Sequence, residues 1–295
     1  MEAQLSLRNI LFPTDFSKSC EAIADHVLGV AKLARATVWL LNVVPRLEDW
    51  HGASEMYFGP FSGSALAALE KDRKFLEAQR LSALQQFQKQ YFAEINSELS
   101  VTSGGVAETI IDFAREKNAG MLMMPTHTLG RHRRFLLGSV TAKILHDAPC
   151  PVWTSPHPRE LNAFRPYRRI LLALDYRSPR IPSLVRASEF AQFFGARLTV
   201  LSAIPHTPGT SADVIQQLKS EVGSKLERCL RECNVNASIR LREGNPGDVI
   251  REVAEEVEEA DLIITGRALL DETNGHVHSH SSEIIWNAPC PVITL

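Results

Sequence analysis

The strongest constraint on the fold is an internal repeat, because the chain contains one sequence unit twice. RNILFPTD at 8–15 matches RRILLALD at 168–175, and ATVWLLNVVP at 36–45 matches ARLTVLSAIP at 196–205. Near the end of each copy, DAPCPVWT at 147–154 matches NAPCPVIT at 287–294. A repeat of this length predicts two domains of the same fold.

The spacing of these matches places an insertion in the first copy, after Pro45. We expect a first domain over 1–157 with an insertion at about 46–75, and a second domain over 166–295. The stretch SPHPRELNAFRPYRR between them contains three prolines and lacks apolar periodicity, which is typical of a linker.

Each copy alternates short apolar runs with longer helical patterns. In the first copy, strands are predicted at 10–12, 38–44, 98–102, 121–124 and 151–154, and helices at 76–92, 107–117 and 139–146. A further helix, which Ser17 or Ser19 can cap, is predicted after the first strand from an apolar stripe between Ala22 and Ala34. Runs that are apolar on both faces are typical of buried parallel strands, and strands that alternate with helices imply right-handed crossovers. The sequence therefore predicts the α/β class, with two tandem, doubly wound, Rossmann-like parallel-sheet domains.

The last strand of each copy would leave an apolar edge. We expect the strands around Val152 and Val292 to pack against each other, since unpaired apolar edges are prone to association. One chain then forms an intramolecular pseudo-dimer.

Composition limits the partners and the location of the chain. It contains 32 Lys and Arg against 34 Asp and Glu, so its net charge of -2 gives no general attraction for nucleic acid. Five sparse cysteines fit free thiols in a reducing compartment. No apolar stretch is long enough to cross a membrane, and the amino terminus lacks the pattern of a secretory signal. We expect a cytoplasmic protein that binds neither nucleic acid nor membranes.

A ligand of such a sheet binds beyond the carboxyl ends of the strands, where the strand order reverses. In the first copy these ends are Pro13-Thr14-Asp15, Val43-Val44-Pro45 and Pro125-Thr126-His127. Farther along, the chain crosses a basic loop and enters a helix near Gly138-Ser139, where backbone N–H groups can bind phosphate. The alternative is that Gly138 and Ser139 only cap the helix.

Three ordered motifs identify a family resemblance. ILFPTDFS at 10–17, LLNVVP at 40–45, and LLGSV followed by DAPCPVW within 136–153 resemble the universal stress protein (UspA) family, here as a tandem of two domains. The resemblance covers nearly the whole chain outside the insertion and the linker. It implies an adenine nucleotide α-hydrolase-like fold, dimerisation through the last strand, and a role in the stress response.

Nucleotide-binding members of that family carry a glycine loop that is altered here. Pro125 and Thr128 occupy the first two glycine positions, whereas Gly138 and Ser139 keep the last pair. The resemblance also implies that Asp15 meets the adenosine end of the ligand. It implies an ATP site in the first domain only, and no metal other than magnesium carried by ATP. The residues expected to form this site are Pro13, Thr14, Asp15, Val43, Met124, Thr126, His127, Gly138, Ser139 and Val140.

The second copy departs further from the family pattern. Asp175 is kept, but all three loop glycines are replaced, and His278 stands at the place of Gly138. Asp271 and Glu272 in the same loop repel phosphate. We expect the second domain to have lost the nucleotide.

The leading interpretation is a regulatory binding protein of the stress response. The first alternative is a structural protein that binds an unknown protein partner without nucleotide, alone or as a further homodimer. The less favoured alternative is a slow ATPase or self-phosphorylating enzyme, for which the sequence assigns no catalytic residue. The alternating His276, His278 and His280 could bind a metal, but an exposed loop without metal is the favoured interpretation.

Overall fold

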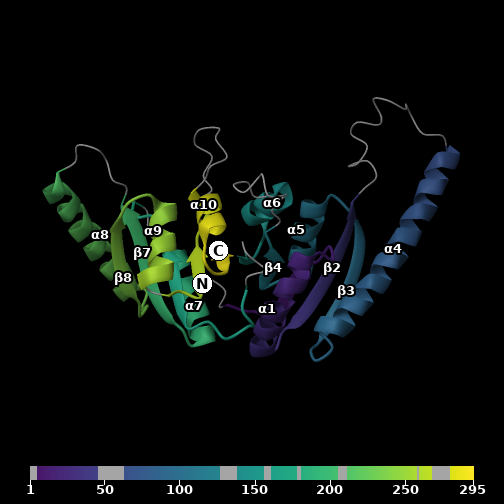
Figure 1. The fold of residues 1–295 in the computed structure, drawn as a ribbon, viewed down its shortest axis with the longest axis horizontal. Helices are drawn as coiled ribbons and strands as arrows, with labels where there is room; N and C mark the ends of the chain where they lie inside the picture. The colour runs from purple at the N-terminus through teal and green to yellow at the C-terminus, as the bar shows by residue number, and fades with distance from the viewer. Residues whose placement is uncertain are drawn as a thin grey trace. The chain divides into compact units, whose positions relative to one another are not determined.

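The computed structural model describes residues 5–45, 63–126, 138–155, 161–177, 181–204, 211–257, 259–267 and 280–295. The first repeat forms β1 (Asn9–Pro13), α1 (Lys18–Ala34), β2 (Thr37–Pro45), α4 (Gly63–Tyr91), β3 (Ser97–Gly104), α5 (Val106–Glu116), β4 (Met121–Pro125), α6 (Ser139–Asp147) and β5 (Val152–Ser155) (Figure 1). The second repeat forms β6 (Arg169–Ala173), α7 (Ile181–Phe194), β7 (Arg197–Ile204), α8 (Ala212–Glu232), β8 (Ser238–Glu243), α9 (Pro246–Glu252), the π-helix η2 (Val253–Val257), β9 (Leu262–Thr265), α10 (His280–Asn287) and β10 (Val292–Thr294).

Local sequence signals explain where these elements begin and end. The side chain of Ser17 accepts a hydrogen bond from the backbone N–H of Cys20 and so caps α1, as one of the two predicted serines should. Arg35 ends this helix in the left-handed conformation, with φ of 51°. The buried stripe of α1 includes Ile23, Val27 and Val30, which recur at helical spacing.

The chain divides into two compact units. Leu7–Met124 and Ser139–Cys150 form the amino-terminal unit, whose strand order is β3-β2-β1-β4. All three pairings in this sheet are parallel, with Ile10 opposite both Val38 and Met121. The chain runs outward from β1 to β3 and then returns to place β4 on the other side of β1. This order is doubly wound and agrees with the predicted fold class.

Pro151–Leu295 belong to the carboxy-terminal unit, with strand order β5-β10-β9-β6-β7-β8. Its pairings are parallel except for that between β10 and β5, in which Ile293 lies opposite Trp153. The pairing expected of the strands around Val152 and Val292 is therefore present. The last strand of the first repeat thus completes the sheet of the second repeat.

The linker contributes to the core of the carboxy-terminal unit. Tyr167 lies just before β6 and is buried, and its hydroxyl accepts a 2.9 Å hydrogen bond from Nε1 of Trp153. Its ring packs against that of Phe194 at a centroid distance of 4.9 Å. The carboxyl end of the linker is therefore a packed segment and not only a spacer.

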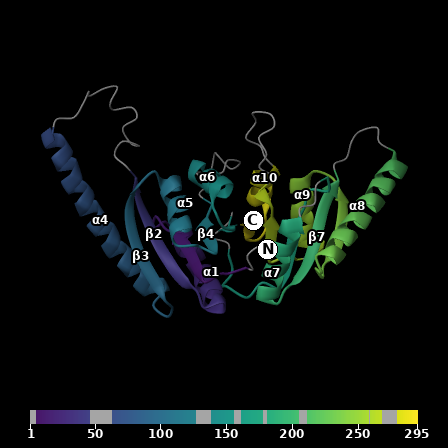
Figure 2. The same ribbon diagram turned by 180° about the vertical axis from the view of Figure 1, so that it is seen from behind.

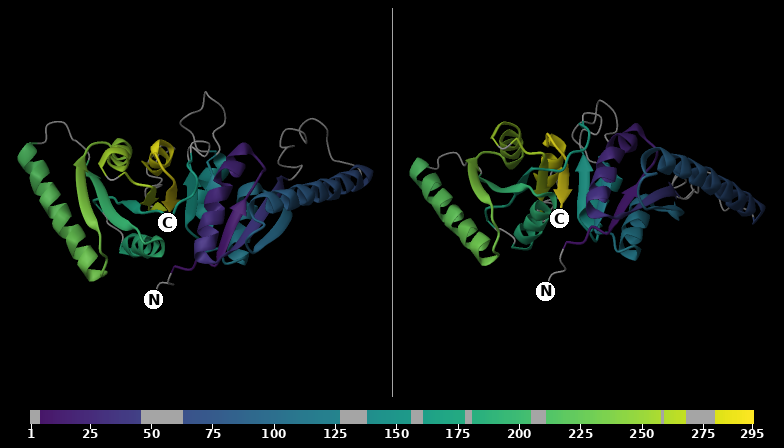
Figure 3. Two further views of the ribbon diagram at one scale, coloured as in Figure 1. Left: turned by 60° about the horizontal axis from the view of Figure 1, so that its bottom comes forward. Right: turned by 90° about the horizontal axis from the view of Figure 1, so that it is seen from below.

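Helix α4 is longer than the sequence pattern predicted, because it begins at Gly63 and not at Leu76. The segment GSALAALEKDRKF is rich in alanine, leucine and lysine, which favour a helix through their intrinsic propensity. Figures 1 and 2 show α4 alongside β3, with its amino-terminal part extending past that strand. The same helix is drawn in blue in Figure 3.

Leu84 and Phe87, in the carboxyl half of α4, are buried, and this half covers the sheet. None of the helices in the described part of the chain is long and apolar enough to cross a membrane.

Candidate functional site

Two hydrogen bonds hold the chain where β1 ends in the amino-terminal unit. The N–H of Thr14 donates to the carbonyl of Leu41 at 2.8 Å. The carbonyl of Thr14 in turn accepts a 2.7 Å bond from Nδ2 of Asn42. Parallel pairing places the ends of β1, β2 and β4 at one edge of the sheet, so Pro13, Thr14, Asp15, Val43 and Met124 all lie at this edge.

Asn42 is not among the site residues that the sequence motifs predicted. It is buried in an otherwise apolar strand, and its Oδ1 has no hydrogen-bond partner among the described residues. The second repeat makes the equivalent bond with a smaller group, since Oγ of Ser202 donates to the carbonyl of Leu174 at 2.9 Å. A polar side chain inside a buried strand was the signal that could have identified Asn42.

The carboxylate of Asp15 is exposed and orders the turn into α1. Its Oδ1 accepts a 2.9 Å bond from the N–H of Ser17 and a 3.3 Å bond from Sγ of Cys20. Burial, together with the charge of Asp15, raises the pKa of Cys20 to about 11. The thiol therefore stays protonated and acts as a donor to Asp15.

Phe16 has the left-handed backbone that glycine favours, with φ of 63°. For a residue with a side chain this conformation costs about 1–2 kcal/mol. Its N–H donates to Oγ1 of Thr14 at 3.1 Å, which closes the turn around Asp15. Backbone strain of this kind is typical of functional sites, and the sequence alone does not reveal it.

The residues at the end of β4 present few groups to a ligand. Met124 and Thr126 are buried. The N–H and the hydroxyl of Thr126 both donate to the carbonyl of Ser155, at 3.2 and 2.8 Å. This hydroxyl is therefore poorly suited to accept a phosphoryl group. His127 and Thr128 lie outside the described residues.

Helix α6 begins at Ser139, in agreement with the expected helix start. Ser139 is exposed, and Gly138 and Val140 are half-buried. The first amides of a helix lack partners within it and carry partial positive charge, so this helix start can receive an anion. The basic loop that precedes it lies outside the described residues.

The second repeat arranges the equivalent aspartate differently. Oδ1 of Asp175 accepts a 2.9 Å bond from the N–H of Arg177 and pairs with its Nε at 3.3 Å. Arg177 stands where the first repeat has Ser17, and an arginine side chain has no acceptor with which to cap a helix. Helix α7 begins farther along the chain, at Ile181.

His276 and His278 lie outside the described residues, as do Asp271 and Glu272. Within the described ranges, no group of three or more His, Cys, Asp or Glu could hold a metal ion.

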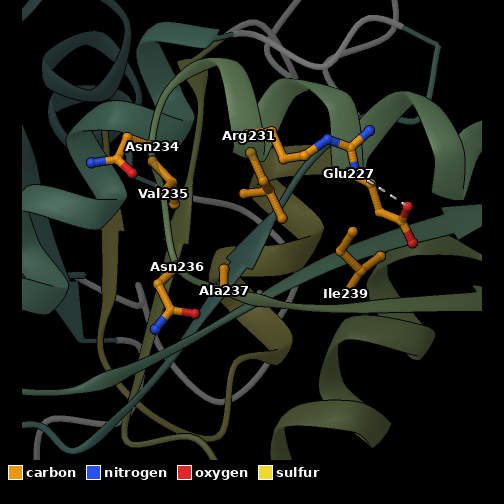
Figure 4. A pocket seen from close by; sticks show the side chains of 8 residues that line it. Glu227, Arg231, Asn234, Val235, Asn236, Ala237 and Ile239 are labelled. Carbon is orange, nitrogen blue, oxygen red and sulfur yellow. Dashed lines mark ion pairs between the residues drawn. The ribbon is translucent and has the colours of Figure 1, made fainter.

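A cavity of about 670 Å³ lies away from these strand ends, at the turn between α8 and β8. Figure 4 shows Arg231 and Glu227 beside it, paired at 3.7 Å, with Asn234 and Asn236 along the turn. This ion pair is exposed, and the cavity lies at the carboxyl end of α8, so it does not offer the helix start found near the strand ends.

Comparison with known proteins identifies relatives of both repeats. The model of the universal stress protein family matches residues 6–156 and again 166–295. Universal stress protein MJ0531 of Methanocaldococcus jannaschii is 28% identical over 161 residues, covering 52% of this chain and 84% of that protein. Universal stress protein Sll1654 of Synechocystis sp. is 31% identical over 152 residues, covering 52% of this chain and 87% of that protein.

Solved structures of similar length share the fold. A universal stress protein from Archaeoglobus fulgidus has a TM-score of 0.61 at 18% identity, covering 98% of both chains. A putative universal stress protein from Pseudomonas aeruginosa has a TM-score of 0.62 at 16% identity, covering 99% of this chain and 94% of that one. At these identities the similarity shows the fold alone.

Two other matching structures contain a nucleotide, a universal stress protein in complex with cAMP and one from Archaeoglobus fulgidus in complex with dAMP. Each covers 44% of this chain, with TM-scores of 0.33 and 0.34.

Proposed function

The chain belongs to the universal stress protein family, and from this premise we propose that it is a regulatory protein of the stress response whose first repeat alone binds an adenine nucleotide. The observation that carries the proposal is the exposed carboxylate of Asp15 just beyond the carboxyl end of β1. Asp15 accepts from Ser17 and Cys20, whereas Asp175 is ion-paired with Arg177. An exposed carboxylate at the end of a parallel strand suits a sugar hydroxyl, which donates a hydrogen bond to it.

The residues of the first repeat fit an adenine nucleotide in two respects. Asp15 would accept from the ribose, and the first amides of α6, at Gly138 and Ser139, would donate to phosphate oxygens. Magnesium would enter with ATP as its counterion. The altered loop supplies fewer backbone donors than a loop with three glycines, because Pro125 has no N–H. We therefore expect weak binding.

Calorimetric titration of ATP with magnesium into the full chain tests this proposal. We expect saturable heat with one ATP per chain, lost in Asp15→Ala and retained in Asp175→Ala. These two substitutions are a matched pair, because they remove the same group from the two repeats. If the heat of ATP binding is retained in Asp15→Ala and lost in Asp175→Ala, the nucleotide binds to the second repeat and the proposal is contradicted.

A second function is favoured by the contacts at the end of β4. The N–H and hydroxyl of Thr126 are both bonded to Ser155, and Pro125 has no N–H, so neither residue donates to phosphate. These contacts support a nucleotide-independent protein that acts through a protein partner. Mass spectrometry of small molecules released from the purified chain separates the two functions. An adenine nucleotide supports the first, and empty protein that also gives no heat with ATP supports the second.

A further inference from the structure

Helix α4 reaches the turn that carries Asp15, although the two are far apart in the sequence. The guanidinium carbon of Arg80 lies 5.9 Å from the centroid of the Phe16 ring. The ring of Phe87, on the same helix, lies 6.1 Å from Phe16 in an edge-on arrangement with an interplanar angle of 66°. Both contacts are within the amino-terminal unit. The strained residue of the turn is therefore held from outside by a cation and an aromatic ring.

The position of this part of α4 is set by a contact with the sheet. Ser103, near the carboxyl end of β3, donates a hydrogen bond to Glu77 of the helix. Glu77 also forms an ion pair with Arg73 at 3.8 Å. The segment that contains Arg80 therefore lies at the same edge of the sheet as the candidate site.

In the second repeat the corresponding helix contacts the backbone of the turn, since Nζ of Lys225 in α8 donates to the carbonyl of Arg177 at 3.2 Å. Tyr176 occupies the place of Phe16, and it is not among the described residues with positive φ. The cation over its ring is Arg177, at 5.6 Å, which also pairs with Asp175. In the second repeat the cation over the Tyr176 ring belongs to the next residue, Arg177, which also forms the ion pair with the carboxylate of Asp175. In the first repeat the cation comes from α4.

We propose that Arg80 is a positioning residue for the adenine-nucleotide site of the first repeat. Its contact with the ring stabilises the left-handed backbone of Phe16, and that backbone directs the carboxylate of Asp15. This inference rests on the proposed function, in which Asp15 receives the adenosine end of the ligand. Arg80 acts through Phe16 and does not itself bind the nucleotide.

A double-substitution cycle distinguishes this indirect role from direct binding. Titration of ATP with magnesium compares the full chain with Arg80→Ala, Phe16→Gly and the double variant. We expect Arg80→Ala to weaken binding about two- to fivefold, as loss of a cation–π contact predicts. Glycine adopts a positive φ without strain, so Arg80→Ala should have no further effect in the Phe16→Gly background.

Two control variants test whether the effect depends on a cation at position 80. Arg80→Lys should restore most of the affinity, because an ammonium group can also lie over the ring. Arg73→Ala removes a cation from the same helix, and we expect unchanged affinity. An equal loss from Arg80→Ala in both backgrounds, or no loss in either, would overturn the proposal.

A measurement without ligand separates failure of this inference from failure of the proposed function. Cys20 is 1% exposed and donates to Asp15, so a loosened turn should increase its rate of alkylation, measured by peptide mass spectrometry. Cys150, buried in the same unit, is the internal standard. We expect faster alkylation of Cys20 in Arg80→Ala than in the wild type. Faster alkylation of Cys20 without ATP binding would reject the nucleotide function but support the effect of Arg80 on the Asp15 turn. An unchanged alkylation rate would overturn that effect of Arg80.

Discussion

In both repeats the first strand is followed by an aspartate and an aromatic residue, Asp15-Phe16 and Asp175-Tyr176, and the repeats differ at the next position. In the first repeat this is Ser17, which caps α1 and lets the helix begin at Lys18. In the second it is Arg177, which pairs with Asp175. The comparison teaches that the residue after this pair decides whether the turn gains a serine cap for the helix or a cation for the carboxylate.

The helices that follow the second strands also differ. Helix α4 brings Phe87 against Phe12 and Phe92, with ring centroids about 6 Å apart. Helix α8 contains no aromatic residue and buries the aliphatic side chains of Val222, Leu226 and Leu230. Aromatic rings are large and rigid, so α4 can hold a residue beyond the end of the sheet, as it does with Phe16.

The largest expected effect is that of Gly138→His, which copies the loop of the second repeat into the first. The imidazole would occupy the space of the phosphate and displace about two charge-assisted hydrogen bonds, each worth about 1.5–3 kcal/mol. We expect ATP binding to weaken by about 3–6 kcal/mol, beyond the range of calorimetric titration. Far-ultraviolet circular dichroism should be unchanged. Retained affinity would mean that this helix start does not distinguish the repeats.

The next effect concerns alkaline pH and the buried thiol of the amino-terminal unit. The pKa of Cys20 is raised from 9.0 to about 11, so folding favours the neutral thiol. Its contribution to stability is complete below pH 9 and is lost as the pH rises toward 11. Across this window we expect the free energy of unfolding of the amino-terminal unit to fall by up to about 2–3 kcal/mol. Urea unfolding at several pH values measures this loss.

Cys20→Ala is the control for that experiment, because it should remove the pH dependence in this window. The carboxy-terminal unit should also lose stability from about pH 9, and its loss should continue beyond pH 11, since burial raises the pKa values of Cys290 and Tyr167 still further. An equal loss of stability of the amino-terminal unit in Cys20→Ala and in the wild type would contradict the assignment to Cys20.

A smaller effect is expected where the linker meets the core. The first repeat has Leu7 at the place that Tyr167 takes in the second, so only the second makes the bond with Trp153. Tyr167→Phe removes this hydrogen bond and should lower the free energy of unfolding by about 0.5–1.5 kcal/mol in chemical denaturation. In a Trp153→Phe background the same substitution should cost nearly nothing. Equal costs in both backgrounds would show that the bond does not contribute.

The smallest effect is expected for Arg177→Ser, which gives the second repeat the residue of the first. The ion pair with Asp175 is largely exposed, so its loss should change the free energy of unfolding by less than about 1 kcal/mol. The substitution should not create a second ATP site, because the loop of this repeat lacks all three glycines. A second binding event in calorimetric titration would show that Arg177 alone separates the repeats.

Much of the fold could be predicted because its signals are local. The strand at Ile10–Phe12 and the helix start at Ser139 follow from apolar runs and caps, and both are present. The amino-terminal extension of α4 was missed, because a helix whose sequence lacks a clear apolar period is marked only by its intrinsic propensity. The roles of the predicted site residues remain predictions, and His127 lies outside the described residues.

The sequence by itself determined the duplication, the α/β class and the position of Asp15 at a strand end, since all three depend on the order and spacing of neighbouring residues. Only the tertiary structure decided that Arg80 lies over Phe16, that Phe16 takes a left-handed backbone, and that Tyr167 meets Trp153. These contacts join residues distant in the chain, and the strain at Phe16 persists because the surrounding contacts stabilise it. Periodicity records which face of an element is buried, but not which side chain it meets there.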